Sequence, residues 1–128
     1  MKFRAILLTV VMTSTVQANS VFMIEPEEAS SRANYVNILS LFEALRTEKH
    51  ITSMIFKDSK LKIPNSNFRY KVKLCEQVDL LEDQKRFIRA NKIYNESYEN
   101  YIKALENQKR QLNIEINDNC SELYNERG

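Results

Sequence analysis

The chain has 128 residues, of which 43% are hydrophobic and 28% are charged, so it has room for one small domain with a modest core. Its only glycine is the terminal Gly128, and it has two prolines. Sheet proteins and α/β enzymes need glycine in turns and where the backbone approaches a ligand. The composition therefore favours an all-α fold and disfavours phosphate-binding loops.

Residues 1–18 have the pattern of a secretory signal peptide. Lys2 and Arg4 form a positive start, residues 5–12 form a short apolar run, and small residues follow where a signal peptidase could cut. The alternative is an uncleaved membrane anchor, but a helix that crosses a bilayer needs about 20 apolar residues. We therefore expect the leader to be removed and residues 19–128 to form one periplasmic or secreted domain with no stable membrane insertion.

Removal of this leader changes the charge of the chain. The whole sequence has 19 basic and 17 acidic residues, and the leader contains two basic residues and no acidic one, which leaves 17 of each. A chain with no net charge lacks the positive surface that binding to phosphate backbones requires. We therefore expect no nucleic-acid partner.

The first part of the mature chain predicts one amphipathic helix over about 27–49. Pro26 and the two glutamates after it suit a helix start, because proline fits the first turn and acids favour the positive end of the helix dipole. Apolar residues then recur at spacings of three and four. They are Tyr35, Ile38, Leu39, Phe42 and Leu45. The next segment, 50–66, is expected to be irregular, and it either extends this helix into a loop or forms a small β-hairpin.

The segment 67–124 contains neither glycine nor proline and is predicted to be helical. Its first residues, 68–74, alternate apolar and basic side chains as a strand does. They run without a break into a helical pattern, so we favour helix there. Acid–base pairs four residues apart, such as Glu99 and Lys103, suit the solvent side of a helix.

Two arrangements of this segment are open, a coiled-coil-like helical hairpin and one continuous long helix. Cys75 and Cys120 are equidistant from a polar cluster at residues 95–98, so a reversal there would bring the two sulfurs level. Two cysteines in an exported chain are typical of one structural disulfide. We favour the hairpin, closed by a bond between these two residues. In the continuous helix, the same cysteines would cross-link a homodimer.

A heptad seam runs along the second half of this segment, with steps of three and four residues from Tyr94 to Leu112. Tyrosine packs its ring while its hydroxyl reaches water, and it is enriched at protein interfaces. We therefore predict that a helical face binds a protein partner through this seam, and the competing interpretation places the seam in the intramolecular core. The predicted partner-binding residues are Tyr94, Tyr98, Tyr101 and Leu105.

The sequence shows no pattern typical of catalysis or of metal binding. His50 is the only histidine, and a catalytic role would need a nucleophile and an acid brought to it by folding. A solvated histidine at a helix end is the favoured interpretation. One histidine and two distant cysteines do not have the spacing of a zinc site, and there is no C-x-x-C redox motif. We expect no enzymatic activity, no metal and no cofactor.

Together these features predict a non-enzymatic, exported protein–protein interaction module, such as an envelope-assembly accessory, a chaperone-like factor or a secretion-apparatus component. Its helical face would bind a groove or a helix of the partner. The alternative is an inhibitor or immunity-type protein that acts on an extracytoplasmic enzyme. Such a protein would expose an ordered loop, for which residues 57–67 are the candidate.

Leader removal can be tested directly. We expect the protein recovered from a secreting host to begin at Asn19, because Ala18 supplies the small residue that a signal peptidase needs before the cut. N-terminal sequencing and intact mass measure this. Ala18→Arg places a bulky side chain at the cut and should keep the leader attached. Recovery of the wild-type chain in the membrane fraction with residues 1–18 still present would contradict the prediction.

Overall fold

The computed structural model describes residues 28–127, and every regular element in that part of the chain is helical. The predicted all-α fold is therefore confirmed. The predicted leader and the start of the domain at residue 19 lie outside the described residues and stay predictions. Within residues 28–127 the elements are α1 (Arg32–Lys57), η1 (Ser59–Leu61), α2 (Ser66–Ala90), η2 (Lys92–Tyr94), α3 (Tyr98–Ile116) and α4 (Cys120–Arg127), where η denotes a one-turn 3₁₀ helix.

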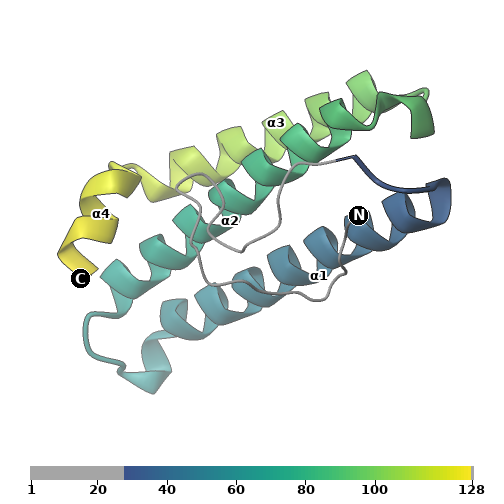
Figure 1. Cartoon of the computed structure of the whole chain (residues 1–128). Coiled ribbons are helices and arrows are strands. Elements are labelled where there is room, and N and C mark those ends of the chain that lie inside the picture. Colours follow the sequence, from purple (N-terminus) through teal and green to yellow (C-terminus); the bar gives the residue numbers. More distant parts are fainter. Residues whose placement is uncertain (1–27, 128) are drawn as a thin grey trace.

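The three long helices lie side by side, and α2 packs against both α1 and α3 (Figure 1). The chain reverses direction after α1 and again around η2, so α1 and α3 run the same way. The short α4 turns back onto α2 at one end of the bundle. Among the described helices, none contains an apolar stretch long enough to cross a membrane.

The first helix begins and ends later than the sequence predicted. Ser31 caps α1, because its hydroxyl accepts the backbone N–H of Asn34 at 3.1 Å. Asp58 stops the helix, because its N–H reaches back to carbonyls of the last turn while its carboxylate accepts the N–H of Lys60 at 3.0 Å. The predicted limits of 27–49 are therefore wrong at both ends.

The small β-hairpin considered for 50–66 is also wrong, since residues 50–57 complete α1 and the described part of the chain has no strand. Ser53 and Phe56 follow each other at a helical spacing of three and extend the inner face of α1, which a strand period of two would not do. After η1 the chain turns through a short loop. In it Lys62 and Asn65 have left-handed backbone conformations, with φ of 52° and 56°.

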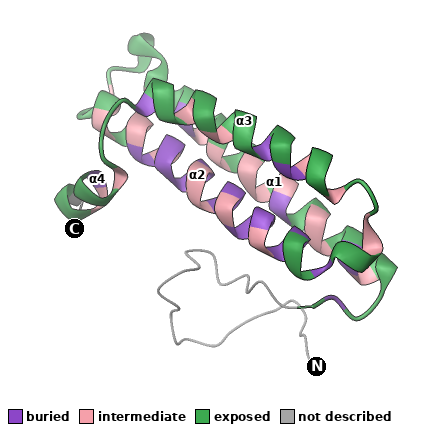
Figure 2. Cartoon of the chain, turned by 90° about the horizontal axis from the view of Figure 1, so that it is seen from above, coloured by how far each residue is buried: buried purple, intermediate pink, exposed green. Residues whose placement is uncertain are grey.

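Helix α2 includes residues 68–74, where the pattern left both helix and strand open. A helix that packs on one neighbour needs one apolar stripe, but α2 contacts α1, α3 and α4 and buries several of its faces. Figure 2 shows buried residues along the length of α2. Its apolar residues therefore do not follow a single stripe, which explains why the start of this helix resembles a strand in the sequence.

The chain reverses between α2 and α3 at residues 91–97. Asn95 supports the turn, because its side-chain oxygen accepts the N–H of Ser97 at 3.0 Å. Since α3 begins only at Tyr98, Tyr94 lies in η2. The predicted heptad seam is therefore not one unbroken helix, because the turn separates Tyr94 from the rest of the seam, which begins at Tyr98 in α3.

The last part of the predicted helical segment 67–124 is interrupted at residues 117–119. Asn117 takes a left-handed conformation with φ of 46° and ends α3. A new cap follows, because the side-chain oxygen of Asn119 accepts the N–H of Glu122 at 3.1 Å. α4 is therefore a separate helix that leaves the direction of α3.

Apolar residues of facing helices form three buried clusters. One cluster joins α1 to α2, and the ring of Phe87 in it lies 5.5 Å from that of Tyr35 and 5.9 Å from that of Phe42. A second joins α2 to α3 through Leu81, Ile88, Ile102 and Leu105. The third lies where α4 covers α2 and consists of Val72, Leu74, Cys75, Ile116 and Leu123. Full burial of one such large side chain contributes roughly 1.5–3 kcal/mol.

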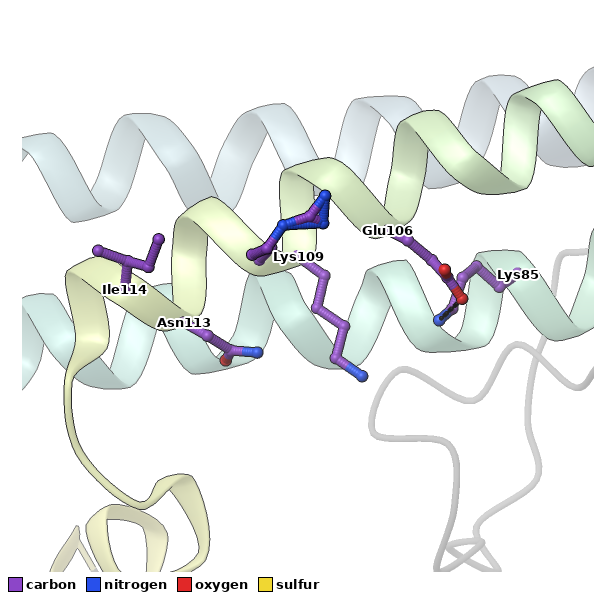
Figure 3. Close-up of a pocket in the computed structure, with 6 residues that line it drawn as sticks. Lys85, Glu106, Lys109, Asn113 and Ile114 are labelled. Atoms are coloured by element: carbon purple, nitrogen blue, oxygen red, sulfur yellow. Dashed lines mark hydrogen bonds and ion pairs between the residues drawn. The ribbon is translucent and has the colours of Figure 1, made fainter.

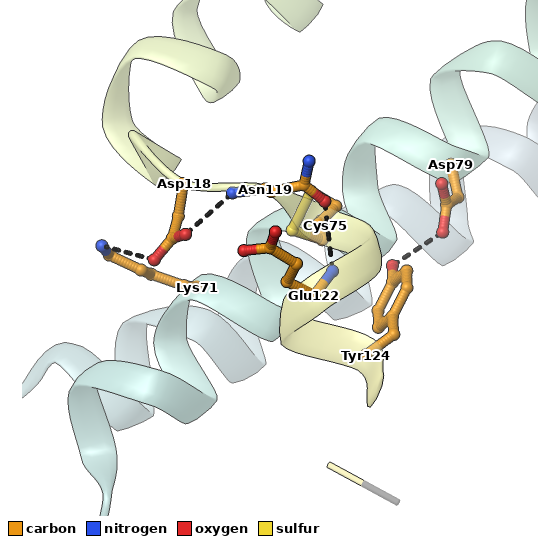
Figure 4. The surroundings of a disulfide bond; sticks show 8 residues. Lys71, Cys75, Asp79, Asp118, Asn119, Glu122 and Tyr124 are labelled. Atoms are coloured by element: carbon orange, nitrogen blue, oxygen red, sulfur yellow. Dashed lines mark hydrogen bonds and ion pairs between the residues drawn. A yellow bond between two sulfur atoms is a disulfide. The ribbon is translucent and has the colours of Figure 1, made fainter. Parts of the chain in front are cut away.

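A disulfide bond joins Cys75 in α2 to Cys120 at the start of α4, with 5.8 Å between the Cα atoms. Figure 4 shows two further contacts across this junction. The hydroxyl of Tyr124 donates to the carboxylate of Asp79 at 2.7 Å, and the ammonium of Lys71 lies 3.7 Å from the carboxylate of Asp118. The bond therefore holds an eight-residue helix that is too short to be stable in isolation.

Removal of this disulfide should destabilise the fold. The bond closes a loop with a sequence separation of 45 residues, and the chain-entropy model assigns about 4 kcal/mol to a loop of that length. We expect the double variant Cys75→Ala, Cys120→Ala to lose most of that free energy of unfolding in urea titrations. Reductant should shift the wild-type midpoint toward that of the variant and leave the variant unchanged. Equal midpoints for the oxidised wild type and the variant would contradict this.

Candidate functional site

The four residues predicted to bind a partner face the interior of the bundle. Leu105 is 1% exposed and belongs to the cluster between α2 and α3, against which Tyr98 and Tyr101 also pack. Tyr94 packs on the other side, with its ring centroid 5.7 Å from that of Tyr35 in α1. The structure thus places Tyr94 apart from the other three. In this conformation the set holds helices of the same chain together.

Tyr101 takes part in a polar layer that joins all three long helices. Its hydroxyl donates to the carboxylate of Glu43 and accepts from the side-chain amide of Gln84, each at 2.9 Å. The same amide donates to Glu43 at 3.0 Å. Arg46 completes the layer, because its guanidinium donates to Gln84 at 3.0 Å, to Gln108 at 2.7 Å and to Glu43 at 2.6 Å. Each long helix therefore contributes at least one side chain.

This layer shifts the protonation equilibria of two of its members. Burial and the hydrogen bond to the Glu43 carboxylate raise the pKa of Tyr101 to about 12. Burial by itself would raise the pKa of Glu43. The hydrogen bonds from Gln84 and Tyr101 and the charge of Arg46 outweigh that effect, so the net pKa of this carboxyl lies below its usual value. The layer thus favours an ionised Glu43 beside a neutral Tyr101, whose hydroxyl donates to that carboxylate.

His50 lies exposed on α1. The hydroxyl of the neighbouring Ser53 donates to the backbone carbonyl of His50 at 2.6 Å, so that this hydroxyl is directed away from the imidazole. Among residues 28–127, no group of three or more His, Cys, Asp and Glu side chains is arranged to hold a metal ion.

Two shallow depressions mark the surface of the described bundle. The first lies along α2 and α3 and is crossed by ion pairs (Figure 3). In it Lys85 bridges Glu106 at 3.3 Å and Glu82 at 2.8 Å, and Lys109 reaches Glu82 at 2.8 Å. These lysines are therefore neutralised by acids of the bundle. The second depression is lined by Phe56, Asn65, Phe68, Arg69, Val72, Lys73 and Glu126.

The feature that stands out is the solvent side of α1, which we call the α1 outer face. Helix α1 has fourteen exposed residues, and three of them are charged, Arg32 and Lys57 at its two ends and Glu48 between them. The twelve exposed residues between positions 33 and 55 include no lysine or arginine and one acid, Glu48, together with His50. Ile51 is 56% exposed, and Met54 and Ile55 are each 46% exposed. The α1 outer face consists of Ala33, Val36, Asn37, Ser40, Leu41, Ala44, Thr47, Glu48, Ile51, Met54 and Ile55.

The solvent side of α3 shows what an ordinary face of this bundle looks like. Twelve of its residues are also exposed, and five of them are charged. They are Glu99, Lys103, Glu106, Arg110 and Glu115. Exposed apolar residues scattered singly need no explanation, but a continuous apolar patch is typical of an interaction site. The difference between two neighbouring helices of one bundle therefore identifies the α1 outer face as the candidate site.

Sequence reasoning missed this face because it took one apolar stripe to define α1. The stripe through Tyr35 and Phe42 is the one that packs on α2. A second signal was present, since residues 33–42 include no charged side chain at all. An amphipathic surface helix has charged or polar residues opposite its core stripe. The solvent side of α1 departs from this pattern, because its polar residues Asn37, Ser40 and Thr47 are uncharged and stand among exposed apolar ones.

Comparison with protein-family models, with curated proteins and with solved structures finds no match to this chain. Within the described residues, the α1 outer face and the polar layer beneath α1 are the features that bear on function.

The polar layer predicts a loss of stability at alkaline pH. The pKa of Tyr101 is raised from 10.0 to about 12 on folding. The contribution of this group to the free energy of unfolding is therefore complete below about pH 10 and is lost as the pH rises toward 12. Tyr101→Phe should remove this alkaline loss and cost about 1 kcal/mol at neutral pH. Urea unfolding across this pH window measures both effects. Tyr98→Phe is the matched control, and equal alkaline losses in Tyr101→Phe and wild type would contradict the prediction.

Proposed function

We propose that this chain is a non-enzymatic, exported helical module that binds another protein through the α1 outer face. The observation that carries the proposal is the almost complete lack of charge on that face, in a protein that is 28% charged overall. Water solvates such a face poorly, so covering it with another apolar surface is favourable.

The spacing of the exposed residues suits recognition by a helix or a groove. Ala44, Thr47, Ile51 and Met54 follow one another in steps of three and four, as the anchors of a helix bound in a groove do. Five larger apolar residues of the face are about half exposed. Covering each would contribute about 1 kcal/mol, so that the gross gain is about 5 kcal/mol before the costs of association. This magnitude fits a reversible interaction.

Two features support export. The Cys75–Cys120 bond is of the kind that persists in oxidising compartments such as the periplasm or the extracellular space. The signal-peptide pattern of residues 1–18 agrees with that location. In this proposal the α2–α3 pair is a coiled-coil-like scaffold that presents α1, and the disulfide fastens α4 to the α2 side of that scaffold. The tyrosines predicted to bind a partner pack within that scaffold. We therefore assign the docking role to the α1 outer face.

A second function retains support from one observation. The loop after α1 carries Leu61, which is 52% exposed and directly precedes Lys62, a residue with a left-handed backbone conformation. Asp58 holds its first turn through the N–H of Lys60. An ordered loop with an exposed apolar tip fits an inhibitor or immunity-type protein that enters the cleft of an extracytoplasmic enzyme. The two functions place the decisive residues in different elements.

The proposal is tested with paired substitutions on different faces. We expect the full chain to retain a specific protein from the exported fraction of its source organism, and Ile51→Glu with Met54→Glu to reduce this retention at least tenfold, because two charges would be buried against an apolar surface. Ile93→Glu with Ile114→Glu is the matched control, since these residues are 85% and 66% exposed outside α1. Quantitative mass spectrometry measures retention, and circular dichroism checks that all variants fold.

Three results would decide among the alternatives. Retention lost in the α1 variant and kept in the control supports docking through the α1 outer face. Retention lost only in Leu61→Glu favours the inhibitor function. Equal retention by wild type, control and α1 variant would overturn the proposal.

A further inference from the structure

We propose that the α1 outer face docks onto the same face of a second copy of this chain, with the two α1 helices antiparallel. This inference rests on the proposed function, because it names the partner of the same surface. It rests on a second property of the face, which is independent of its low charge. When one copy of the helix is reversed, the large side chains along the centre of one face lie opposite small side chains of the other.

The centre line of the face shows this match. At 100° per residue, Ser40, Ala44, Thr47 and Ile51 lie within a narrow stripe on the side of α1 away from α2. A twofold axis between Ala44 and Thr47 places Ile51 of each copy opposite Ser40 of the other. It places Ala44 of each copy opposite Thr47 of the other. The bulky residue thus meets a small one, and small residues at the centre allow the two backbones to approach closely.

The two edges of the face come within one residue of the same register. On one edge, reversal about the same axis brings Val36 to within one residue, about 1.5 Å, of the level of Met54 of the second copy. On the other edge it brings Asn37 equally close to the level of Ile55 of the second copy. In every case a residue of the first half of α1 meets one of the second half. A C2 interface has this property, since residue i contacts residue j while j contacts i.

The single acid of the face does not oppose this arrangement. In the antiparallel register Glu48 lies beside Leu41 of the second copy, at the edge of the face. The two copies of Glu48 are offset by five residues, about 7.5 Å along the helix axes. A parallel arrangement is less favourable, because it would set Ile51 against itself at one end and Ser40 against itself at the other. Voids and crowding would then alternate along the contact between the two α1 helices.

The size of the face sets the strength of the dimer. The α1 outer face has eleven residues, whereas a standard protein–protein interface uses roughly 20–30 residues on each side. We therefore expect a reversible dimer with a dissociation constant in the micromolar range. At low concentration the chain would be a monomer with the face exposed and available to other proteins.

A concentration series of the purified full chain tests the dimer. Light scattering and sedimentation should show the mass rise from that of the monomer, 15.1 kDa before leader removal, toward twice that value. Ile51→Glu should weaken self-association at least tenfold, and Ile114→Glu on α3 should not change it. A wild type that stays monomeric at every concentration, or a dimer that Ile51→Glu leaves unchanged, would overturn the inference.

Single added cysteines test the orientation. In the antiparallel register the two copies of Ala44 are three residues apart along the axis, about 4.5 Å, whereas the two copies of Val36 are about 28 Å apart. Oxidation should therefore cross-link Ala44→Cys and leave Val36→Cys uncross-linked, with the native disulfide intact in both. Efficient cross-linking of both variants would indicate parallel helices and overturn the inference.

The outcomes separate this inference from the proposed function. Suppose that the wild type is monomeric at every concentration, and that Ile51→Glu with Met54→Glu abolishes the retention of a different protein. The dimer is then overturned, and the interaction role of the face stands. A monomer that retains no partner overturns both. A dimer that Ile51→Glu weakens supports both, and self-assembly is then the interaction that the face performs.

Discussion

Gln84 is fully buried in the second half of α2, and its amide is bonded to both neighbouring helices. Its nitrogen donates to Glu43 of α1 and to Tyr101 of α3, and its oxygen accepts from Arg46 of α1. A buried amide is costly unless its donors and acceptor are satisfied, so the three helices are constrained to the register in which these groups meet. Apolar contacts on either side of the layer stabilise the bundle, but they tolerate sliding more readily than this set of directed bonds does.

This constraint decides what each helix shows to solvent. Tyr101 has to point inward to reach Gln84, and Leu105, one helical turn further on, then points inward as well. The seam that resembles a docking surface in the sequence is thereby used within the chain. On α1 the same layer turns Arg46 and the half-exposed Glu43 toward α2, so neither charge lies on the outer side of this helix. The low charge of the α1 outer face, which has Glu48 alone, is thus a consequence of the polar layer as much as of the exposed residues.

The sequence was sufficient for the parts of the fold that depend on local chemistry. A chain with one terminal glycine could be assigned to the all-α class, and two lone cysteines could be paired. The bond forms, however, because α4 turns back onto α2 after Asn117, and not because one straight helical arm carries Cys120 level with Cys75. Left-handed asparagines have no strong pattern in a sequence without glycine, so the interruption of the helix was missed. Nor can periodicity state which of two apolar stripes on α1 is covered, because that depends on where the other helices lie.

The disulfide and the α1 outer face lie on different elements, and this separation bears on how the molecule can work. The bond clasps α4 to α2, where Leu123 and Tyr124 complete a local cluster. Stability at that end of the bundle therefore does not depend on what covers α1. An exposed apolar helix face lowers solubility and would be a liability in a chain that unfolds easily, since unfolding would add further apolar surface. A scaffold held by a covalent bond and a directed polar layer limits that risk, and so it permits α1 to keep exposed apolar residues on its solvent side.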